Sequence, residues 1–286
     1  MNFGIQLFSL PKMLETDLPT SLQLLAEMGY QELETYGPYP FSAAASKAGW
    51  DAITPMLGFS GSGYYGRSLA DFSALLNDYN LRVPSMHTDF ETIESAMPQL
   101  AQAADKLGAT YVTIPTTPED LRTSLDDYHR LAERFNQIGE SAHQFGLKFA
   151  YHNHGYGLTA LDGQLPIQIL LDETEVDKVF WEIDIYWTTA GGLDPIDLLN
   201  NNPGRYHLLH IKDMREKVRF SGDGGNPSQW MELFPYMTTA GDGILDLPGI
   251  MQAAKSSGVK HFIVEQDIVA EPEVALKRSI DYLQTL

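Results

Sequence analysis

Cysteine is absent from the 286-residue sequence. Its absence excludes disulfide bonds, thiolate zinc sites and cysteine nucleophiles, so any metal ion must bind through nitrogen and oxygen atoms. Long apolar runs are also absent, and no stretch approaches the roughly 18 consecutive apolar residues of a membrane span. The first residues have neither a basic start nor a long apolar run, so we expect no signal peptide and a cytoplasmic protein.

Positive charge is scarce, because 19 Lys and Arg residues face 38 Asp and Glu residues, for a net charge of −19. The basic residues occur singly or in short pairs, as in Lys277-Arg278, and the sequence shows no local basic patch. A chain of this charge repels polyanions on average. We therefore expect no nucleic acid and no membrane as a partner, and whether the chain forms a homo-oligomer stays open.

A repeated pattern organises the chain: an amphipathic helix ends at a glycine, and a short β-rich run follows. It occurs at Asp17–Met28, Glu94–Leu107, Leu121–Phe145 and Asp246–Ser257. Alternating helices and strands indicate βαβ units and a parallel sheet. The eight candidate strands are FGIQLF, QELETY, LRVPSMH, YVTIP, LKFAYH, VFWEIDIY, YHLLHIK and HFIVEQ.

Eight such units predict an α/β fold, a (β/α)₈ TIM barrel that forms a single domain over residues 1–286. A doubly wound dinucleotide-binding sheet would carry a glycine-rich turn after its first strand, and Phe8–Pro11 is not one. Two connections are long, Gly37–Arg67 and Met214–Gly243. Both follow a strand, and the first is rich in aromatic residues, so we expect a lid or a pocket wall.

Polar residues stand at the ends of the candidate strands, which share one mouth in a barrel. They are Gln6, Glu34, His87, His152, His154, Glu182, Asp184, His210, Lys212, Glu265 and Asp267. Residues two apart share a face of a strand, so one member of such a pair can reach a metal while the other lies a layer away. A lone histidine is more often a hydrogen-bonded core residue, and His154 could support a neighbouring ligand instead.

Imidazole and carboxylate ligands together suit Zn²⁺, Mn²⁺, Co²⁺ or Fe²⁺. The HNH string at residues 152–154 does not indicate an HNH nuclease, because the ββ-metal-α context of those enzymes is missing.

With these residues, the chain resembles the xylose isomerase-like TIM barrel superfamily, and its sugar phosphate isomerase/epimerase group in particular. The resemblance spans nearly the whole chain through GIQLFSL, GYQELETYG, VPSMH, GLKFAYHNH, FWEIDIYWTTAGGLDP, LLHIKDM and GVKHFIVEQD. It implies a divalent metal (Mn, Zn or Co) held at the ends of strands five to eight, here by His152, Asp184, His210 and Glu265. Many relatives have glutamate at the position of His152, so Glu265 is the one clear counterpart of the two bridging glutamates of epimerases.

The resemblance implies a sugar isomerase or epimerase that removes a proton next to a carbonyl through an enediolate. Candidates for the general base are Glu265, Glu34, His87 and His154, and Lys212 could stabilise the oxyanion. The same intermediate can expel a β-substituent, so a keto-sugar dehydratase or lyase is the alternative. A carbohydrate-binding barrel without turnover also stays open, whereas the charge disfavours phosphodiester hydrolysis.

No glycine-rich phosphate loop is present, so we expect an unphosphorylated sugar, keto-sugar or glycoside as substrate. Arg67, Arg215 and Arg219 lie in or near the long connections and are the candidates for binding an anion.

Overall fold

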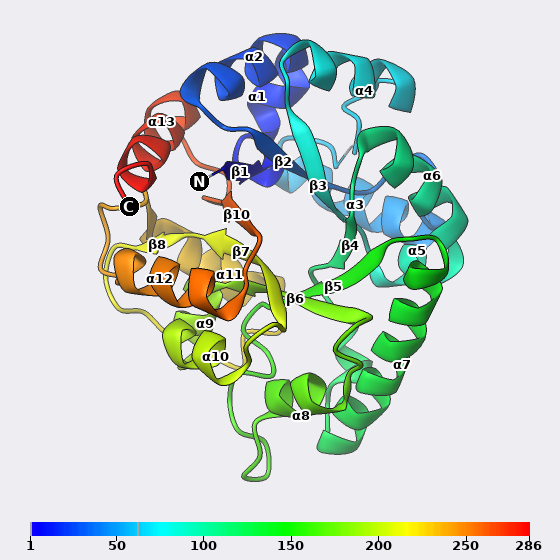
Figure 1. The fold of residues 1–286 in the computed structure, drawn as a ribbon, viewed down its shortest axis with the longest axis vertical. Helices are drawn as coiled ribbons and strands as arrows, with labels where there is room; N and C mark the ends of the chain where they lie inside the picture. The colour runs from blue at the N-terminus through cyan, green and yellow to red at the C-terminus, as the bar shows by residue number, and fades with distance from the viewer. Residues whose placement is uncertain (1, 62) are drawn as a thin grey trace.

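Eight parallel strands pair edge to edge and close into a barrel (Figure 1). The computed structural model describes residues 2–61 and 63–286. Around the barrel the strands follow the order β1-β10-β7-β6-β5-β4-β3-β2. Their bounds are β1 Phe3–Gln6, β2 Glu32–Tyr36, β3 Arg82–His87, β4 Tyr111–Ile114, β5 Lys148–His152, β6 Val179–Asp184, β7 Tyr206–Ile211 and β10 His261–Val264. The (β/α)₈ barrel predicted from the alternating pattern is therefore confirmed.

Helices surround the barrel and cover its outer surface (Figure 1). The α-helices are α1 Pro11–Thr16, α2 Leu18–Met28, α3 Ala44–Leu57, α4 Leu69–Asp78, α5 Phe90–Ser95, α6 Met97–Leu107, α7 Leu125–Gln144, α8 Pro166–Glu173, α9 Ile185–Gly191, α10 Pro195–Asn201, α11 Pro227–Leu233, α12 Leu247–Ser257 and α13 Pro272–Leu283. Short 3₁₀ turns lie at Leu7–Ser9, Glu119–Leu121 and Phe234–Tyr236. Apolar side chains between helices and strands form one large core cluster, as expected for a sheet covered on its outer face by helices.

Several predicted boundaries differ from the structure, among them the start of α7 at Leu125 and the ends of β1 at Gln6 and β10 at Val264. The helix expected over Glu94–Leu107 is two helices, α5 and α6, because the chain leaves the helical conformation at Ala96, just before Pro98. The strand expected to reach Tyr186 ends at Asp184. There the carboxylate of Asp184 accepts a hydrogen bond from the backbone N–H of Trp187 at 2.8 Å and caps α9.

The two long connections contain regular structure. The first holds α3 (Ala44–Leu57), and the second holds α11 (Pro227–Leu233) together with a small antiparallel ribbon of β8 (Asp213–Met214) and β9 (Met237–Thr238). Asp213 fixes the base of the second connection, because its carboxylate accepts hydrogen bonds from the backbone N–H groups of Gly241, Gly243 and Leu245. Both connections therefore contain ordered secondary structure near the barrel mouth.

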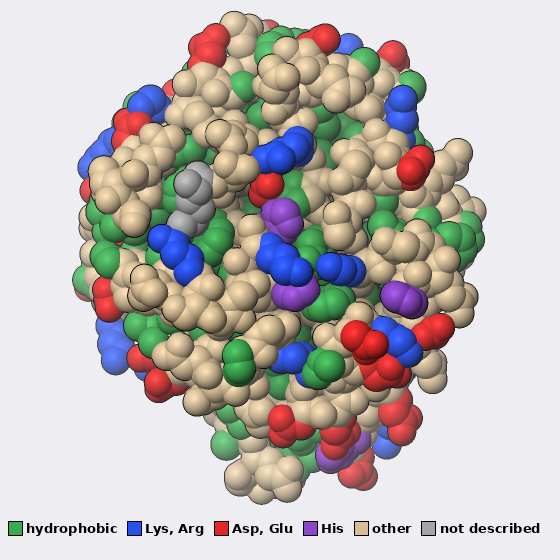
Figure 2. Space-filling view, viewed as in Figure 1, with side chains coloured by type: hydrophobic (Ala, Val, Ile, Leu, Met, Phe, Trp, Pro, Cys, Tyr) green, Lys and Arg blue, Asp and Glu red, His purple; other side chains and the backbone are tan. Residues whose placement is uncertain are grey.

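Basic residues meet at the N-terminal end of the barrel, although the linear sequence shows no basic patch. Lys148, His207 and His261 lie at the starts of their strands, and Lys148 and Lys260 both act electrostatically on His207. In the view of Figure 2, Lys, Arg and His side chains gather near the centre of the molecule. These residues come from separate strands, so only barrel closure brings them together. No helix among the described residues has the length and hydropathy to cross a bilayer.

Candidate active site and metal centre

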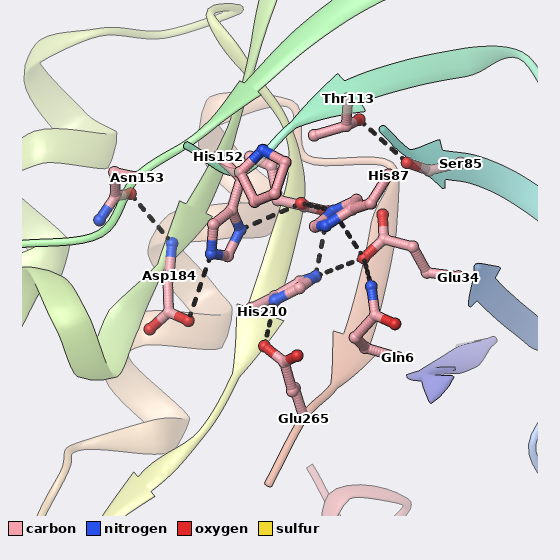
Figure 3. Close-up of polar contacts among 12 residues, drawn as sticks. Gln6, Glu34, Ser85, His87, Thr113, His152, Asn153, Asp184, His210 and Glu265 are labelled. Atoms are coloured by element: carbon pink, nitrogen blue, oxygen red, sulfur yellow. Dashed lines mark hydrogen bonds and ion pairs between the residues drawn. The ribbon is translucent and has the colours of Figure 1, made fainter. Parts of the chain in front are cut away.

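Polar side chains from six strands, and from the residue that follows β10, meet inside the C-terminal half of the barrel (Figure 3). They are Gln6, Glu34, His87, His152, Glu182, Asp184, His210 and Glu265, and each is at most 6% exposed. Buried groups of this kind are unfavourable unless they are paired or bind a metal. Because these residues come from strands far apart in the sequence, their convergence indicates a functional site.

The deeper part of the cluster consists of two carboxylates and two imidazoles. Nε2 of His87 lies 2.7 Å from Glu182 and 3.0 Å from Glu34. Nε2 of His210 lies 2.6 Å from Glu34 and 3.3 Å from the second oxygen of Glu182. Burial acts to lower the pKa of His87, but the two carboxylates outweigh it and raise that pKa to about 9. In this layer the buried carboxylates of Glu34 and Glu182 therefore favour the protonated form of the imidazoles that they contact.

The upper part of the cluster lies nearer the mouth. Nδ1 of His210 lies 2.8 Å from Glu265, and Nε2 of His152 lies 3.8 Å from Asp184. The ammonium of Lys212 lies 3.2 Å from Asp184 and 2.7 Å from Glu265, and it donates a hydrogen bond to Asp267 at 2.6 Å. Three carboxylates thus converge on the single cation of Lys212.

The upper part has the composition and spacing of a metal site. Ligand atoms of Asp184, His210 and Glu265 lie within 4.8 Å of one another. One carboxylate oxygen of Asp184 is buried, and among the described residues its contacts are the ion pair with Lys212 at 3.2 Å and the approach of His152 at 3.8 Å. Two ligands on a tetrahedral ion with bonds of about 2.0–2.1 Å lie roughly 3.4 Å apart, close to the 3.8 Å between His152 and Asp184. The residues therefore fit a divalent ion bound through nitrogen and oxygen.

A second group of ligand atoms includes His87, His152, Glu182 and His210. It shares His210 with the first group, and it contains Glu182, which was noted at a strand end but not assigned to the site. Glu182 precedes Asp184 by two residues, and this spacing puts the two carboxylates on one face of β6 in successive layers. The two-residue alternation along the strand indicates that Glu182 faces the same side as Asp184. Its contact with three imidazoles depends on barrel closure.

The protonation state of His154 is set by burial, and its tautomer is set by a hydrogen bond. Nδ1 donates to the backbone carbonyl of Pro115 at 2.7 Å. Burial, followed by the charges of His152 and Lys212, holds the pKa of His154 well below its ordinary value. Its ring stacks on Trp230 with centroids 4.3 Å apart. Nε2 makes no hydrogen bond among the described residues, so it can accept one from a ligand.

A cavity of about 600 Å³ opens above the cluster. The candidate residues on its floor are His87, His152, His154, Lys212 and Glu265. Three others do not line it: Glu34, Asp184 and His210 lie beneath the lining residues. Asp267, which was not assigned to the site from the sequence, also lines it.

Both long connections supply walls of the cavity, which confirms the expected pocket wall. The first contributes Trp50 and Ile53, and the second contributes Trp230 and Met231. Arg67, Arg215 and Arg219, the candidates for anion binding, do not line the cavity.

Arg122 joins the second connection to the loop after β4. Its guanidinium donates to the carbonyl of Gly225 at 2.8 Å and to that of Thr117 at 3.3 Å. It also lies over the ring of Tyr156, 3.9 Å from the centroid. Because these contacts join three segments, Arg122 holds the wall that carries α11 in place.

Comparison with known proteins extends these observations. Residues 42–286 match the family model described as xylose isomerase-like TIM barrel. An inosose dehydratase of Lacticaseibacillus casei is 28% identical over 158 residues, which cover 55% of this chain and 51% of that protein. The chain thus spans about half the length of such curated relatives.

Two further proteins match over more of the chain. The rhizopine catabolism protein MocC of Rhizobium meliloti is 25% identical over 269 residues, covering 88% of this chain and 76% of that protein. The crystal structure of a sugar phosphate isomerase/epimerase from Parabacteroides distasonis superimposes with a TM-score of 0.75 at 25% identity, covering 99% of this chain and 93% of that one.

Proposed function

The chain belongs to the xylose isomerase-like TIM barrel family, and we propose that it is a metal-dependent sugar isomerase or epimerase acting on a keto-sugar or a related polyol. The observation that carries this proposal is the buried imidazole and carboxylate cluster that lies under a cavity at the C-terminal end of the barrel. In barrels of this kind, active sites lie at that end.

The metal ligands in this proposal are His152, Asp184, His210 and Glu265. A divalent ion bound there, with Mn, Zn and Co as the candidates, would supply Lewis acidity that polarises the carbonyl of the substrate. Asp184 is oriented for this role, because one of its carboxylate oxygens caps α9 and the other is left for the metal. His210 is held between Glu265 and Glu34.

His154 is the general base in this proposal. Its Nδ1–H is engaged with Pro115, which leaves the lone pair of Nε2 available to a ligand in the cavity that His154 lines. Lys212 lies on the same floor and can donate a hydrogen bond to the oxygen that gains negative charge when the proton leaves. His87 and Glu34 are bound to each other, so they support the neighbouring ligands in this scheme and do not take the proton.

Elimination is the second candidate reaction, and the similarity to inosose dehydratases favours it. In that case His154 takes the proton next to the carbonyl, the carbon–oxygen bond at the β-position breaks, and the hydroxyl leaves as water with a proton donated by Lys212. The position of His152, where many relatives have glutamate, also favours elimination, since a two-base epimerisation uses two carboxylates.

Solvent exchange tests the proposal. The metal-loaded protein is incubated in D₂O with an inosose and with ketohexoses, and NMR follows the C–H positions next to the carbonyl. Isomerisation or epimerisation gives a product with deuterium at that carbon, whereas elimination gives a conjugated product that absorbs in the ultraviolet. We expect His154→Gln to lower the rate at least 100-fold, and His129→Gln, at an exposed histidine on α7, to leave it unchanged. Unchanged exchange in His154→Gln would contradict the assignment of the base.

A further inference from the structure

Helix α3 has an apolar face that is not buried in the protein. None of its 14 residues is buried, although Trp50, Ile53 and Leu57 recur at three- and four-residue spacing and line the cavity. The side chain of Met56, which also lines the cavity, belongs to a residue that is 63% exposed. A surface helix normally turns its apolar stripe to the core. In this chain Trp50 packs against the core beside Tyr36 and also lines the cavity, and Ile53 and Leu57 line the cavity as well.

The opposite wall is apolar as well. Trp230 and Met231 of α11, with Phe234 directly after it, line the cavity from the second long connection. The indole of Trp230 is held in place, because its N–H donates to the carbonyl of Gly224 at 2.7 Å and its ring stacks on His154. Met231 is 42% exposed. A fixed aromatic ring therefore stands where the polar floor ends and the apolar walls begin.

The size of the cavity exceeds what one sugar ring requires. Ligand pockets of about 300–1,000 Å³ enclose drug-sized molecules, and this cavity measures about 600 Å³. Outside the floor, its polar lining comes mainly from the loops after β3 and β4, through Thr88, Asp89, Thr116, Thr117, Glu119 and Arg122. The space between α3 and α11 offers few hydrogen-bond partners, and hydroxyl groups buried there without partners would be unfavourable.

We propose that the substrate is a polyol ring that carries a flat apolar or aromatic substituent, with the ring on the polar floor and the substituent between α3 and α11. The placement of the polyol rests on the proposed function. The affinity for the substituent does not depend on turnover, because Trp50, Ile53, Leu57 and Met231 contact it through apolar surface alone. The substrate class is therefore that of aryl-substituted or similarly apolar glycosides and polyols.

Calorimetry with two glucosides that lack a carbonyl tests this subsite separately from catalysis. We expect 4-nitrophenyl β-glucoside to bind the full-length protein at least tenfold more tightly than methyl β-glucoside. Ile53→Asp, on the wall of α3, should remove most of this difference and leave the affinity for the methyl glucoside unchanged. Met231→Asp tests the opposite wall with the same expected result. Val274→Asp, at an exposed apolar residue of α13 outside the cavity lining, is the matched control and should behave as wild type.

Equal affinities for the two glucosides, or no binding of the aryl glucoside, would overturn the subsite. Sedimentation velocity on the same variants tests a second copy of the chain as the occupant. Self-association that Ile53→Asp abolishes, with the aryl preference unchanged, would assign this face to an interface and overturn the proposal. Deuterium exchange distinguishes the two proposals, because an aryl preference without exchange refutes the proposed function and leaves the subsite standing.

Discussion

Replacement of Arg205 by methionine should destabilise the protein strongly without changing the active site. Arg205 is 7% exposed and lies at the N-terminal side of β7. Its guanidinium donates to the carbonyl of Leu171 at 2.6 Å, to the carbonyl of Thr174 at 3.1 Å and to the hydroxyl of Thr174 at 2.5 Å. These acceptors lie at the C-terminal end of α8, so Arg205 acts as the cap of that helix.

A hydrogen bond to a charged group contributes about 1.5–3 kcal/mol, and a buried acceptor left without a partner adds to the loss. Arg205→Met keeps much of the apolar stem but removes all three bonds, so we expect a loss of about 3 kcal/mol in the free energy of unfolding. For a chain of this size that corresponds to a fall in Tm of roughly 5 °C.

Thermal and urea unfolding followed by circular dichroism measure the effect of Arg205→Met. The matched control is Arg278→Met, which removes an exposed arginine whose ion pair with Asp242 measures 2.7 Å. Exposed pairs contribute less than about 1 kcal/mol, so this control should melt near wild type. Metal content per folded chain should be equal in both variants. A loss in Arg205→Met no larger than in the control would refute the assignment of the buried cap.

Two further predictions concern the N-terminal end of the barrel and the cavity wall. Burial, followed by the charges of Lys260 and its neighbours, lowers the pKa of His207 to about 4. The pKa in the unfolded chain is about 6.5. The stability that comes from neutral His207 is therefore lost as the pH falls from about 6.5 to about 4. NMR titration should give that pKa for His207, and Lys260→Ala should raise it. A pKa near 6.5 in wild type would contradict the effect of burial and neighbouring positive charge on His207. A Cβ at Gly155 would lie 2.3 Å from the ring of Phe220 and 2.7 Å from the backbone of Gly224. Gly155→Ala should therefore displace the second long connection and raise KM more than it lowers kcat. Unchanged kinetics would show that the wall tolerates the shift.

The alternation of helices and strands was sufficient to predict the barrel, because each unit has a local signature in hydrophobic period and glycine caps. Gly29, Gly108 and Gly258 have the positive φ angles expected where helices end. The periodic pattern over Glu94–Leu107 does not predict the split at Ala96, and the end of β6 at Asp184 depends on a side-chain cap that a local pattern does not specify. Local patterns thus predict elements better than their boundaries.

Strand-end polarity predicted which residues converge, but it could not rank them by depth. Glu34 and His87 form an ion pair with each other, but of the two only His87 lines the cavity. Strand-end polarity does not distinguish Glu182 from Asp184 as a ligand, and the carboxylate of Glu182 contacts three imidazoles. These contacts join residues up to 176 positions apart, as for Glu34 and His210, and barrel closure alone sets such distances.

The apolar face of α3 illustrates a different limit. Its periodic residues lie within a connection that is rich in glycine and aromatic residues, so the sequence indicated a wall but not a helix. Whether a helical stripe faces core, solvent or cavity depends on what lies opposite, and here that is α11 from a segment about 180 residues later. The cavity wall is therefore the part of the candidate site that local sequence specifies least.

Elemental analysis of the purified protein tests the central claim most directly. After incubation with Mn²⁺ or Zn²⁺ and removal of free ions, we predict about one divalent ion per chain in wild type and in the control His129→Gln. We predict its loss in His210→Ala and Glu265→Ala, with the conservative Glu265→Gln included and circular dichroism used to verify that each variant is folded. No bound metal in wild type, or equal metal in the folded ligand variants, would contradict the metal centre at the strand ends and with it the proposed proton abstraction.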